Sequence, residues 1–264
     1  MDASDEPATV GLGSRLLEHV RAIAGPDRNP STNRDLATLL ALTAGILNSV
    51  GFMAIAIYTS HMTGLTALLA DGLAVGALDV ALLSVVGITA FITGAAACAM
   101  LFNWGRRRGL RSRYALVLML EAVLALLIGL LAQELTAAGR TWALIAVLGF
   151  TMGMQNAIIT KISNAQIRTT HVTGMVTDIG IELGKLVYRR RADDPEPVRA
   201  DLGKLGLHTL LVGAFFVGGL TGALSYMAIG FVTVVPTACI LLLLASIPVI
   251  EDLRDHSRSR RAGA

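Results

Sequence analysis

The feature that most restricts this chain is a series of long apolar runs separated by short charged segments. Six runs are close to the roughly 20 residues that an α-helix needs to cross the hydrocarbon core of a bilayer. They cover residues 36–58, 80–103, 114–134, 141–160, 207–229 and 231–250. Because apolar side chains make up 54% of the 264 residues and charged ones only 16%, we expect one all-α polytopic membrane domain with six transmembrane helices.

Two further apolar stretches, residues 64–78 and 174–188, are too short to cross comfortably, and both contain acidic side chains. The first has a single acid, Asp71, which suits a re-entrant helix buried among others. The second has a polar stripe that includes Asp178 and Glu182 opposite an apolar face, which fits either a water-filled path or the cytoplasmic membrane surface. We therefore predict two short re-entrant or interfacial helices.

The basic residues predict the orientation of the spans. If neither short stretch crosses, 21 of the 22 Lys and Arg residues lie on one face, in the two tails and in the segments 106–113 and 161–204. Only Arg140 lies on the other face. Since cytoplasmic loops of membrane proteins are enriched in Lys and Arg, both termini are expected in the cytoplasm. The acidic start of the chain lacks the basic and apolar segments of a cleavable signal peptide.

A duplicated motif divides the chain into two halves. In the first half Asn48 precedes His61-x-Thr-Gly, and in the second half Asn156 precedes His171-x-Thr-Gly. The asparagines are separated along the chain by almost the same interval as the histidines. Further on, a Val-Gly segment and a Thr-Gly-Ala segment each occur twice, at a longer interval that is again nearly the same for both. Agreement of this kind indicates an internal repeat.

Each half reads as span, motif, short helix, span and span. An odd number of crossings in each half inverts the second copy, so we predict an inverted 3+3 repeat, an architecture typical of transporters and channels. The step from this fold to a function is an analogy. The predicted regions are a cytoplasmic tail at 1–34, repeat 1 at 35–136, repeat 2 at 137–251 and a cytoplasmic tail at 252–264.

The duplicated motifs are the candidate substrate pathway. We expect each to lie just before a helix start, with Thr capping exposed backbone N–H groups and Gly allowing a tight turn. A helix start carries partial positive charge and can hold an anion or a polar oxygen. The alternative is that the threonines only cap helices and the asparagines only join neighbouring helices. The candidates are Asn48, His61, Thr63, Gly64, Asn156, His171, Thr173 and Gly174.

Acidic side chains within or near the apolar runs are candidates for proton coupling. Glu121 lies about two turns inside its span, where an acid needs a partner or water. Asp71, Asp178 and Glu182 are the other candidates.

No sequence pattern points to catalysis, a metal or a cofactor. Both cysteines fall inside apolar runs, which argues against a disulfide or a paired-cysteine metal site. Soluble catalytic motifs and nucleic-acid surfaces are not apparent, so we expect neither an enzyme nor a nucleic-acid partner.

These features favour a transporter or channel for a small polar or anionic solute in a lipid bilayer. One alternative is a non-transporting membrane protein with an assembly or signalling role. A second is an intramembrane enzyme that uses His61 or His171 with Glu121, Asp71 or Asp178. Homo-oligomerisation stays open.

The segments from Asn48 to Gly64 and from Met154 to Gly174, each ending in His-x-Thr-Gly, resemble the YoaK family of bacterial membrane proteins. The resemblance covers about residues 36–250. It implies a multi-pass protein of the bacterial inner membrane, and it brings no established activity because the family is a domain of unknown function.

Overall fold

The computed structural model describes residues 29–162, 171–188 and 198–262, and all its regular elements in these ranges are helical. Most of the predicted N-terminal tail and the charged segment 189–197 lie outside the described residues. The long helices are α2 (Pro30–Ile55), α4 (Leu78–Arg107), α5 (Ala115–Leu131), α6 (Ala137–Ile162), α8 (Leu202–Ile229) and α9 (Val234–Ala262). The shorter elements are α3 (Met62–Val75), α7 (Val172–Val187), η1 (Arg111–Arg113), η2 (Ala132–Glu134) and η3 (Gly230–Thr233).

Local sequence signals account for several helix ends. Helix α2 begins at Pro30 behind Asn29, whose Oδ1 accepts the N–H of Thr32 at 2.8 Å. The Thr32 hydroxyl oxygen in turn accepts the N–H of Asn29 at 3.0 Å, which completes a capping box. Helix α3 ends at Gly76 with φ 75°, and α8 ends at Gly230 with φ 65°. Both glycines adopt left-handed backbone that other residues reach only with strain.

The protein is an integral, multi-pass membrane protein. Five helical segments are long and apolar enough to cross a bilayer, and the last of them, Leu202–Asp255, is 54 residues long and contains α8 and most of α9. Large apolar side chains such as Met100 (67% exposed) and Leu243 (69% exposed) point outward, which suits lipid and not water. Helix α3, with 14 residues, is about 21 Å long and falls short of the roughly 30 Å hydrocarbon core.

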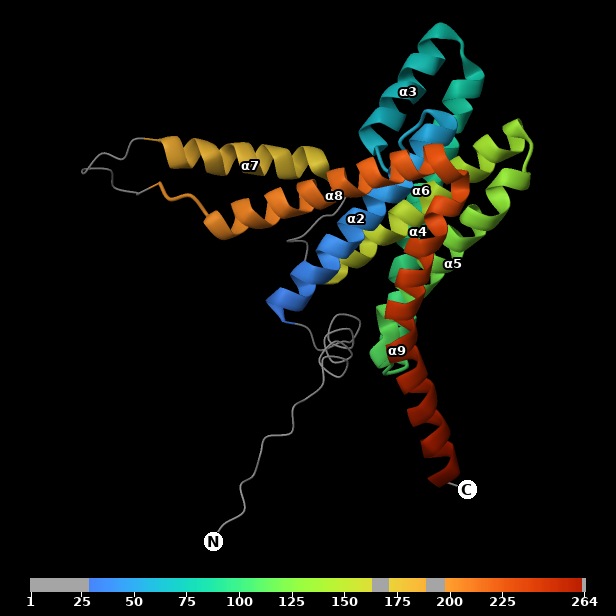
Figure 1. The fold of residues 1–264 in the computed structure, drawn as a ribbon, viewed down its shortest axis with the longest axis vertical. Coiled ribbons are helices and arrows are strands. Elements are labelled where there is room, and N and C mark those ends of the chain that lie inside the picture. Colours follow the sequence, from blue (N-terminus) through green and yellow to red (C-terminus); the bar gives the residue numbers. More distant parts are fainter. Residues whose placement is uncertain (1–28, 163–170, 189–197, 263–264) are drawn as a thin grey trace.

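The helices form a bundle with two projecting hairpins (Figure 1). The most extensive contacts join α2 to α8, α4 to α6 and α5 to α9. Helix α3 folds back on the start of α4, and α7 packs along α8, so each short helix belongs to a hairpin. The buried apolar core comes mainly from α2, α5, α6 and α9.

Glycines allow α2 and α8 to cross backbone against backbone. A Cβ added at Gly45 would overlap the carbonyl oxygen of Phe215, and one added at Gly218 would overlap that of Leu42. Small residues permit this close approach in membranes, where packing replaces the hydrophobic effect between helices.

The crossing of α4 and α6 uses the same device. A Cβ at Gly153 would overlap the Phe91 carbonyl oxygen, and one at Gly94 would overlap that of Phe150. Gly76 has a different role, because it ends α3 and an added Cβ there would meet no atom within 4 Å.

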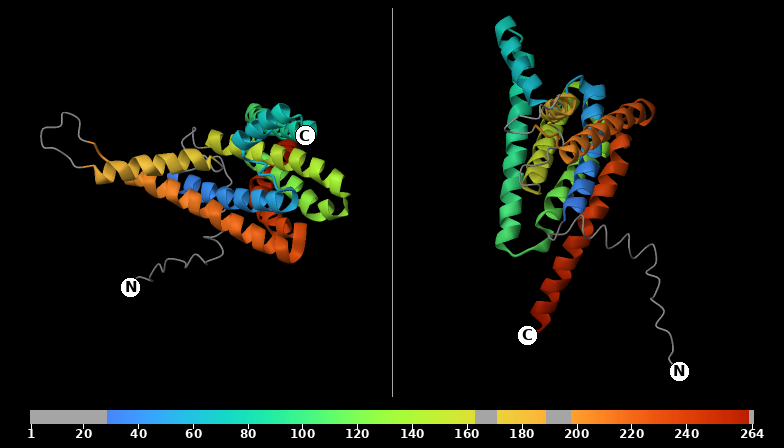
Figure 2. Two further views of the ribbon diagram at one scale, coloured as in Figure 1. Left: turned by 90° about the horizontal axis from the view of Figure 1, so that it is seen from above. Right: turned by 90° about the vertical axis from the view of Figure 1, so that its left-hand side faces the viewer.

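Two polar contacts identify the ends of the bundle. The Asp252 carboxylate, on α9, accepts the backbone N–H groups of Arg111 and Ser112 at 3.3 and 2.8 Å, so the basic α4–α5 turn adjoins the end of α9. In Figure 2 the start of α2 also lies at this end of the bundle. At the other end of α5, Arg140 donates to the carbonyl oxygens of Ala132 and Leu135 at 2.9 and 3.0 Å.

Candidate functional site

The two His-x-Thr-Gly motifs lie at the starts of the short helices. His61 precedes α3 and His171 precedes α7, each at the N-cap position. Neither histidine makes a side-chain cap hydrogen bond, and Thr63 and Thr173 lie within the first helical turn. The expectation that threonine caps these helices was therefore wrong, because the helices begin two residues earlier than expected.

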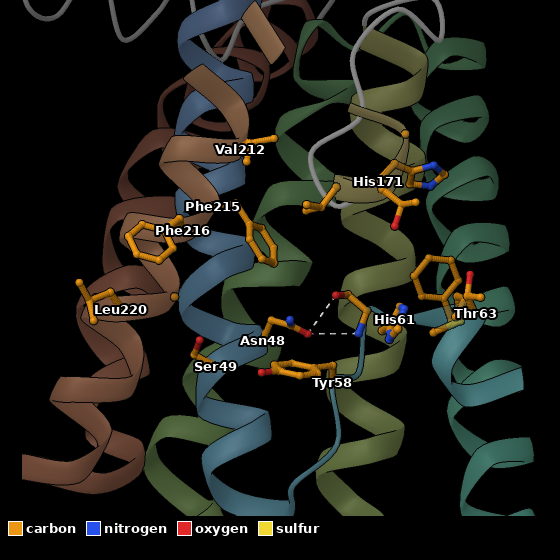
Figure 3. Close-up of a pocket in the computed structure, with 17 residues that line it drawn as sticks. Asn48, Ser49, Tyr58, His61, Thr63, His171, Val212, Phe215, Phe216 and Leu220 are labelled. Atoms are coloured by element: carbon orange, nitrogen blue, oxygen red, sulfur yellow. Dashed lines mark hydrogen bonds between the residues drawn. The ribbon is translucent and has the colours of Figure 1, made fainter. Parts of the chain in front are cut away.

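One cavity of about 860 Å³ brings the two motifs together (Figure 3). His61 and Thr63 line it from the start of α3, and His171, Thr173 and Gly174 line it from the start of α7. Asn48 lines it from α2. Six of the eight predicted pathway residues therefore meet in one space, although the motifs belong to separate halves of the chain.

Asn48 is the most buried polar group in this cavity wall, at 6% exposure. Its Oδ1 accepts the backbone N–H of Ser60 at 3.3 Å and the Ser60 hydroxyl at 2.9 Å. These bonds tie α2 to the connection that leads into α3, as Figure 3 shows. The side chain thus holds the His61 helix start against α2.

Two predicted pathway residues do not line the cavity. Asn156 donates from Nδ2 to the carbonyl oxygen of Met152, one turn earlier on its own helix, at 2.9 Å. Gly64 lies under the ring of His61, where an added Cβ would overlap Nδ1. Gly64 has no positive φ, so it serves by leaving room for the imidazole and not by turning the chain.

Sequence reasoning missed the aromatic wall of the cavity. Phe91 from α4, Phe215 and Phe216 from α8 and Tyr58 from the α2–α3 connection line it. These side chains come from three distant parts of the chain, so no periodic signal relates them. Only the crossings of α2 with α8 and of α4 with α6 bring them to one place.

Glu121 is fully buried in α5 and pairs with a residue that the sequence did not single out. Gln155 Nε2, from α6, donates to Glu121 Oε1 at 2.8 Å and to the carbonyl oxygen of Leu40 at 3.2 Å. The second oxygen of Glu121 and Oε1 of Gln155 have no hydrogen-bond partner among the described residues. The pair lies in the bundle core and not among the cavity residues.

The acids of α7 belong to a polar cluster between α7 and α8. Asp178 pairs with Lys204 at 3.0 Å, and its second oxygen lies 3.6 Å from Nδ1 of the buried His208. Glu182 accepts from Lys185 Nζ at 2.9 Å and from the backbone N–H of Asp201 at 2.8 Å.

Those two hydrogen bonds, first that of the Lys185 ammonium and then that of the backbone N–H, hold the pKa of Glu182 below its usual value. The cluster fastens the hairpin that carries His171, while the fourth predicted acid, Asp71, is exposed on α3.

The described residues contain no group of three or more His, Cys, Asp or Glu side chains that could hold a metal ion. Cys98 is buried and Cys239 is exposed, and both thiols are free.

In a comparison with protein families, residues 36–247 match the model of DUF1275, described as a protein of unknown function. The chain belongs to the DUF1275 family. This agrees with the resemblance to the YoaK family, which is the same family. Searches of curated proteins and of solved structures gave no match. The DUF1275 match runs from α2 into α9 and includes every residue that lines the cavity, so the cavity lies within the family's shared region.

Proposed function

We propose that this DUF1275 protein is a transporter or channel for a small polar or anionic solute, which contacts the cavity between the two His-x-Thr-Gly helix starts. The observation that carries the proposal is that both motifs, from separate halves of the chain, line one cavity together with Asn48. Helix starts and polar side chains that meet inside an apolar bundle form the binding sites of many transporters.

The packing supports six spans arranged as an inverted repeat. Helices α8 and α9 are separate because the chain turns at Gly230, and 54 residues in one straight helix would be about 80 Å long, more than twice the bilayer core. The contact of Gly45 with Phe215 is matched by that of Gly153 with Phe91. Gly45 and Gly153 are separated by the same interval as the duplicated asparagines of α2 and α6, so Phe215 of α8 corresponds to Phe91 of α4.

The second pair of contacts follows the same correspondence between helices. Leu42 of α2 meets Gly218 of α8, and Phe150 of α6 likewise meets Gly94 of α4. The repeated Thr-Gly-Ala segments, 93–95 and 221–223, would instead align Gly94 with Gly222, one helical turn further along α8. Small residues recur on successive turns of these helices, so the sequence alone matched a neighbouring glycine.

The proposed orientation has both termini in the cytoplasm of a bacterial cell. It is supported by the contact of Asp252 with the Arg111 turn, since this contact brings a basic loop beside the C-terminal helix. Arg140 lies at the opposite end of α5 and would be outside.

Glu121 is the proposed site of proton coupling. It is the acid buried at the centre of the bundle, and its only side-chain partner in the described structure is the uncharged Gln155. An acid held in this way inside a membrane protein is expected to have a functional reason, because burial without a counter-charge is costly.

Solute flux into proteoliposomes tests the function. Stopped-flow light scattering reports the entry of any unlabelled solute, so a panel of polyols, amino acids and carboxylates can be compared. We expect flux of at least one class that is lost in the double variant His61→Ala, His171→Ala. Asp79→Asn, on the exposed first turn of α4 and outside the cavity, is the control and should retain the flux.

Unchanged flux in the folded double variant would contradict the proposal. Loss of thermal stability without any flux in the parent protein would instead favour an assembly or signalling role. An intramembrane enzyme would need a histidine next to an acid, and His61 forms no ion pair with an acid in the described part of the chain.

A further inference from the structure

No described residue of the cavity wall carries a fixed charge. None of the 17 described residues that line it is Lys, Arg, Asp or Glu. Its polar groups are the amide of Asn48, hydroxyl groups and the two imidazoles. Moving an ion out of water costs several kcal/mol unless a counter-charge meets it. The partial positive charge at the starts of α3 and α7 further disfavours a cation.

Asn48 directs a hydrogen-bond donor into this cavity. The backbone N–H of Ser60 can only donate, so the Asn48 atom that faces it at 3.3 Å must be the carbonyl oxygen. The amide nitrogen is then on the other side, and no described residue accepts a hydrogen bond from it. Because Asn48 is 6% exposed and lines the cavity, this donor lacks a partner unless a ligand or water supplies one.

The parts of the cavity lining that α4 and α8 contribute are apolar and aromatic. Phe91 reaches the cavity from α4, and Phe215, Phe216 and Leu220 reach it from α8. Figure 3 shows Phe215 and Phe216 on the α8 side, across from the connection that carries His61. A volume of about 860 Å³ is within the roughly 300–1,000 Å³ of sites that bind organic ligands, and such sites combine apolar walls with a few polar groups.

We infer that the cavity binds an uncharged organic solute with a hydrogen-bond acceptor on an apolar ring or chain. The acceptor meets the Asn48 amide nitrogen, and the apolar body packs against Phe91, Phe215 and Phe216. This inference rests on the proposed function and narrows its solute class, but it concerns binding and can be measured without transport.

Four small probes with the same ring test the inference: benzamide, benzoate, benzylammonium and toluene. Binding is measured by saturation-transfer NMR on the protein in phosphatidylcholine nanodiscs, with empty nanodiscs as the background. We expect saturable binding of benzamide, about tenfold weaker binding of the two ions, and weak binding of toluene. Tighter binding of benzoate or benzylammonium, or no binding of benzamide above the background, would overturn the inference.

Variants assign the contacts. Asn48→Leu should weaken benzamide binding about fivefold to tenfold and leave toluene unchanged, because only the hydrogen bond is lost. Asp79→Asn, which is exposed on α4 and outside the cavity, is the control and should bind benzamide and toluene as the parent protein does. If Asn48→Leu does not fold, Phe215→Ala should weaken benzamide and toluene alike.

Benzamide binding that is unchanged in folded Asn48→Leu, or in Phe215→Ala, would refute the placement. If benzamide binds as expected in the parent and in the variants but no solute is transported, only the proposed function is refuted. Flux of anions that requires His61 and His171, with no benzamide binding, would refute only the solute class.

Discussion

The crossing of α2 with α8 predicts a large difference between two glycines of the same helix. Gly218 faces α2, and a Cβ there would lie 2.9 Å from the carbonyl carbon and 3.0 Å from the Cα of Leu42, besides overlapping the carbonyl oxygen. Carbon atoms pack at about 3.5–4.0 Å, so Gly218→Ala must push the helices apart. At Gly213, earlier on the same helix, an added Cβ would meet no atom within 4 Å.

The expected magnitudes follow from these contacts. Overpacking of a tight contact costs about 1–3 kcal/mol, whereas Gly→Ala at an open helical position gains up to about 1 kcal/mol. The free energies of unfolding of Gly218→Ala and Gly213→Ala should therefore differ by about 1–4 kcal/mol. In the crossing of α4 with α6, the Cβ of Gly94→Ala would meet the Phe150 carbonyl. This variant should therefore lower the free energy of unfolding about as much as Gly218→Ala does.

Equilibrium unfolding in mixed detergent micelles, followed by circular dichroism, measures this difference. The parent protein and Gly213→Ala serve as references. If Gly218→Ala unfolds within about 0.5 kcal/mol of Gly213→Ala, the backbone contact between α2 and α8 is absent and the reasoning fails.

Two further predictions concern buried or paired acids. Because hydrogen bonds from Lys185 and a backbone N–H lower the pKa of Glu182, its contribution to stability is complete above the unfolded value of 4.5 and is lost as the pH falls through the lowered pKa. Between pH of about 6 and about 3, the melting temperature of the parent should fall further than that of Glu182→Gln, and equal falls would contradict the pairing. Gln155→Leu should lower the free energy of unfolding by about 1–3 kcal/mol, because Glu121 loses its hydrogen bond inside the core. Glu121→Gln keeps a hydrogen-bonding side chain at position 121, so it should lower the free energy of unfolding by less than Gln155→Leu does. A larger decrease would show that the Glu121 carboxyl has another partner.

Much of the fold could be predicted from apolar runs and breakers. The expected spans correspond to α2, α4, α5, α6, α8 and α9, and the stretches 64–78 and 174–188 correspond to α3 and α7. Bilayer thickness sets a length that is visible in the sequence, and Gly76 and Gly230 mark turns that require positive φ.

The site was only partly predictable, for physical reasons. The repeat identified His61 and His171, but the partners of buried polar groups depend on which helix faces which. Gln155 looked like part of an apolar span until the packing of α5 on α6 put it beside Glu121. The aromatic wall likewise depends on helix crossings, which the sequence marks only through glycines that recur on several turns.

The central claim is that the two motif helix starts face one cavity. Cysteines at positions 61 and 171, in a protein with Cys98→Ala and Cys239→Ser, test it directly. We predict that a bifunctional maleimide that spans the cavity links the two cysteines within one chain, whereas a pair at positions 61 and 79 is not linked. Labelling of both cysteines without any intramolecular link between 61 and 171 would contradict the account.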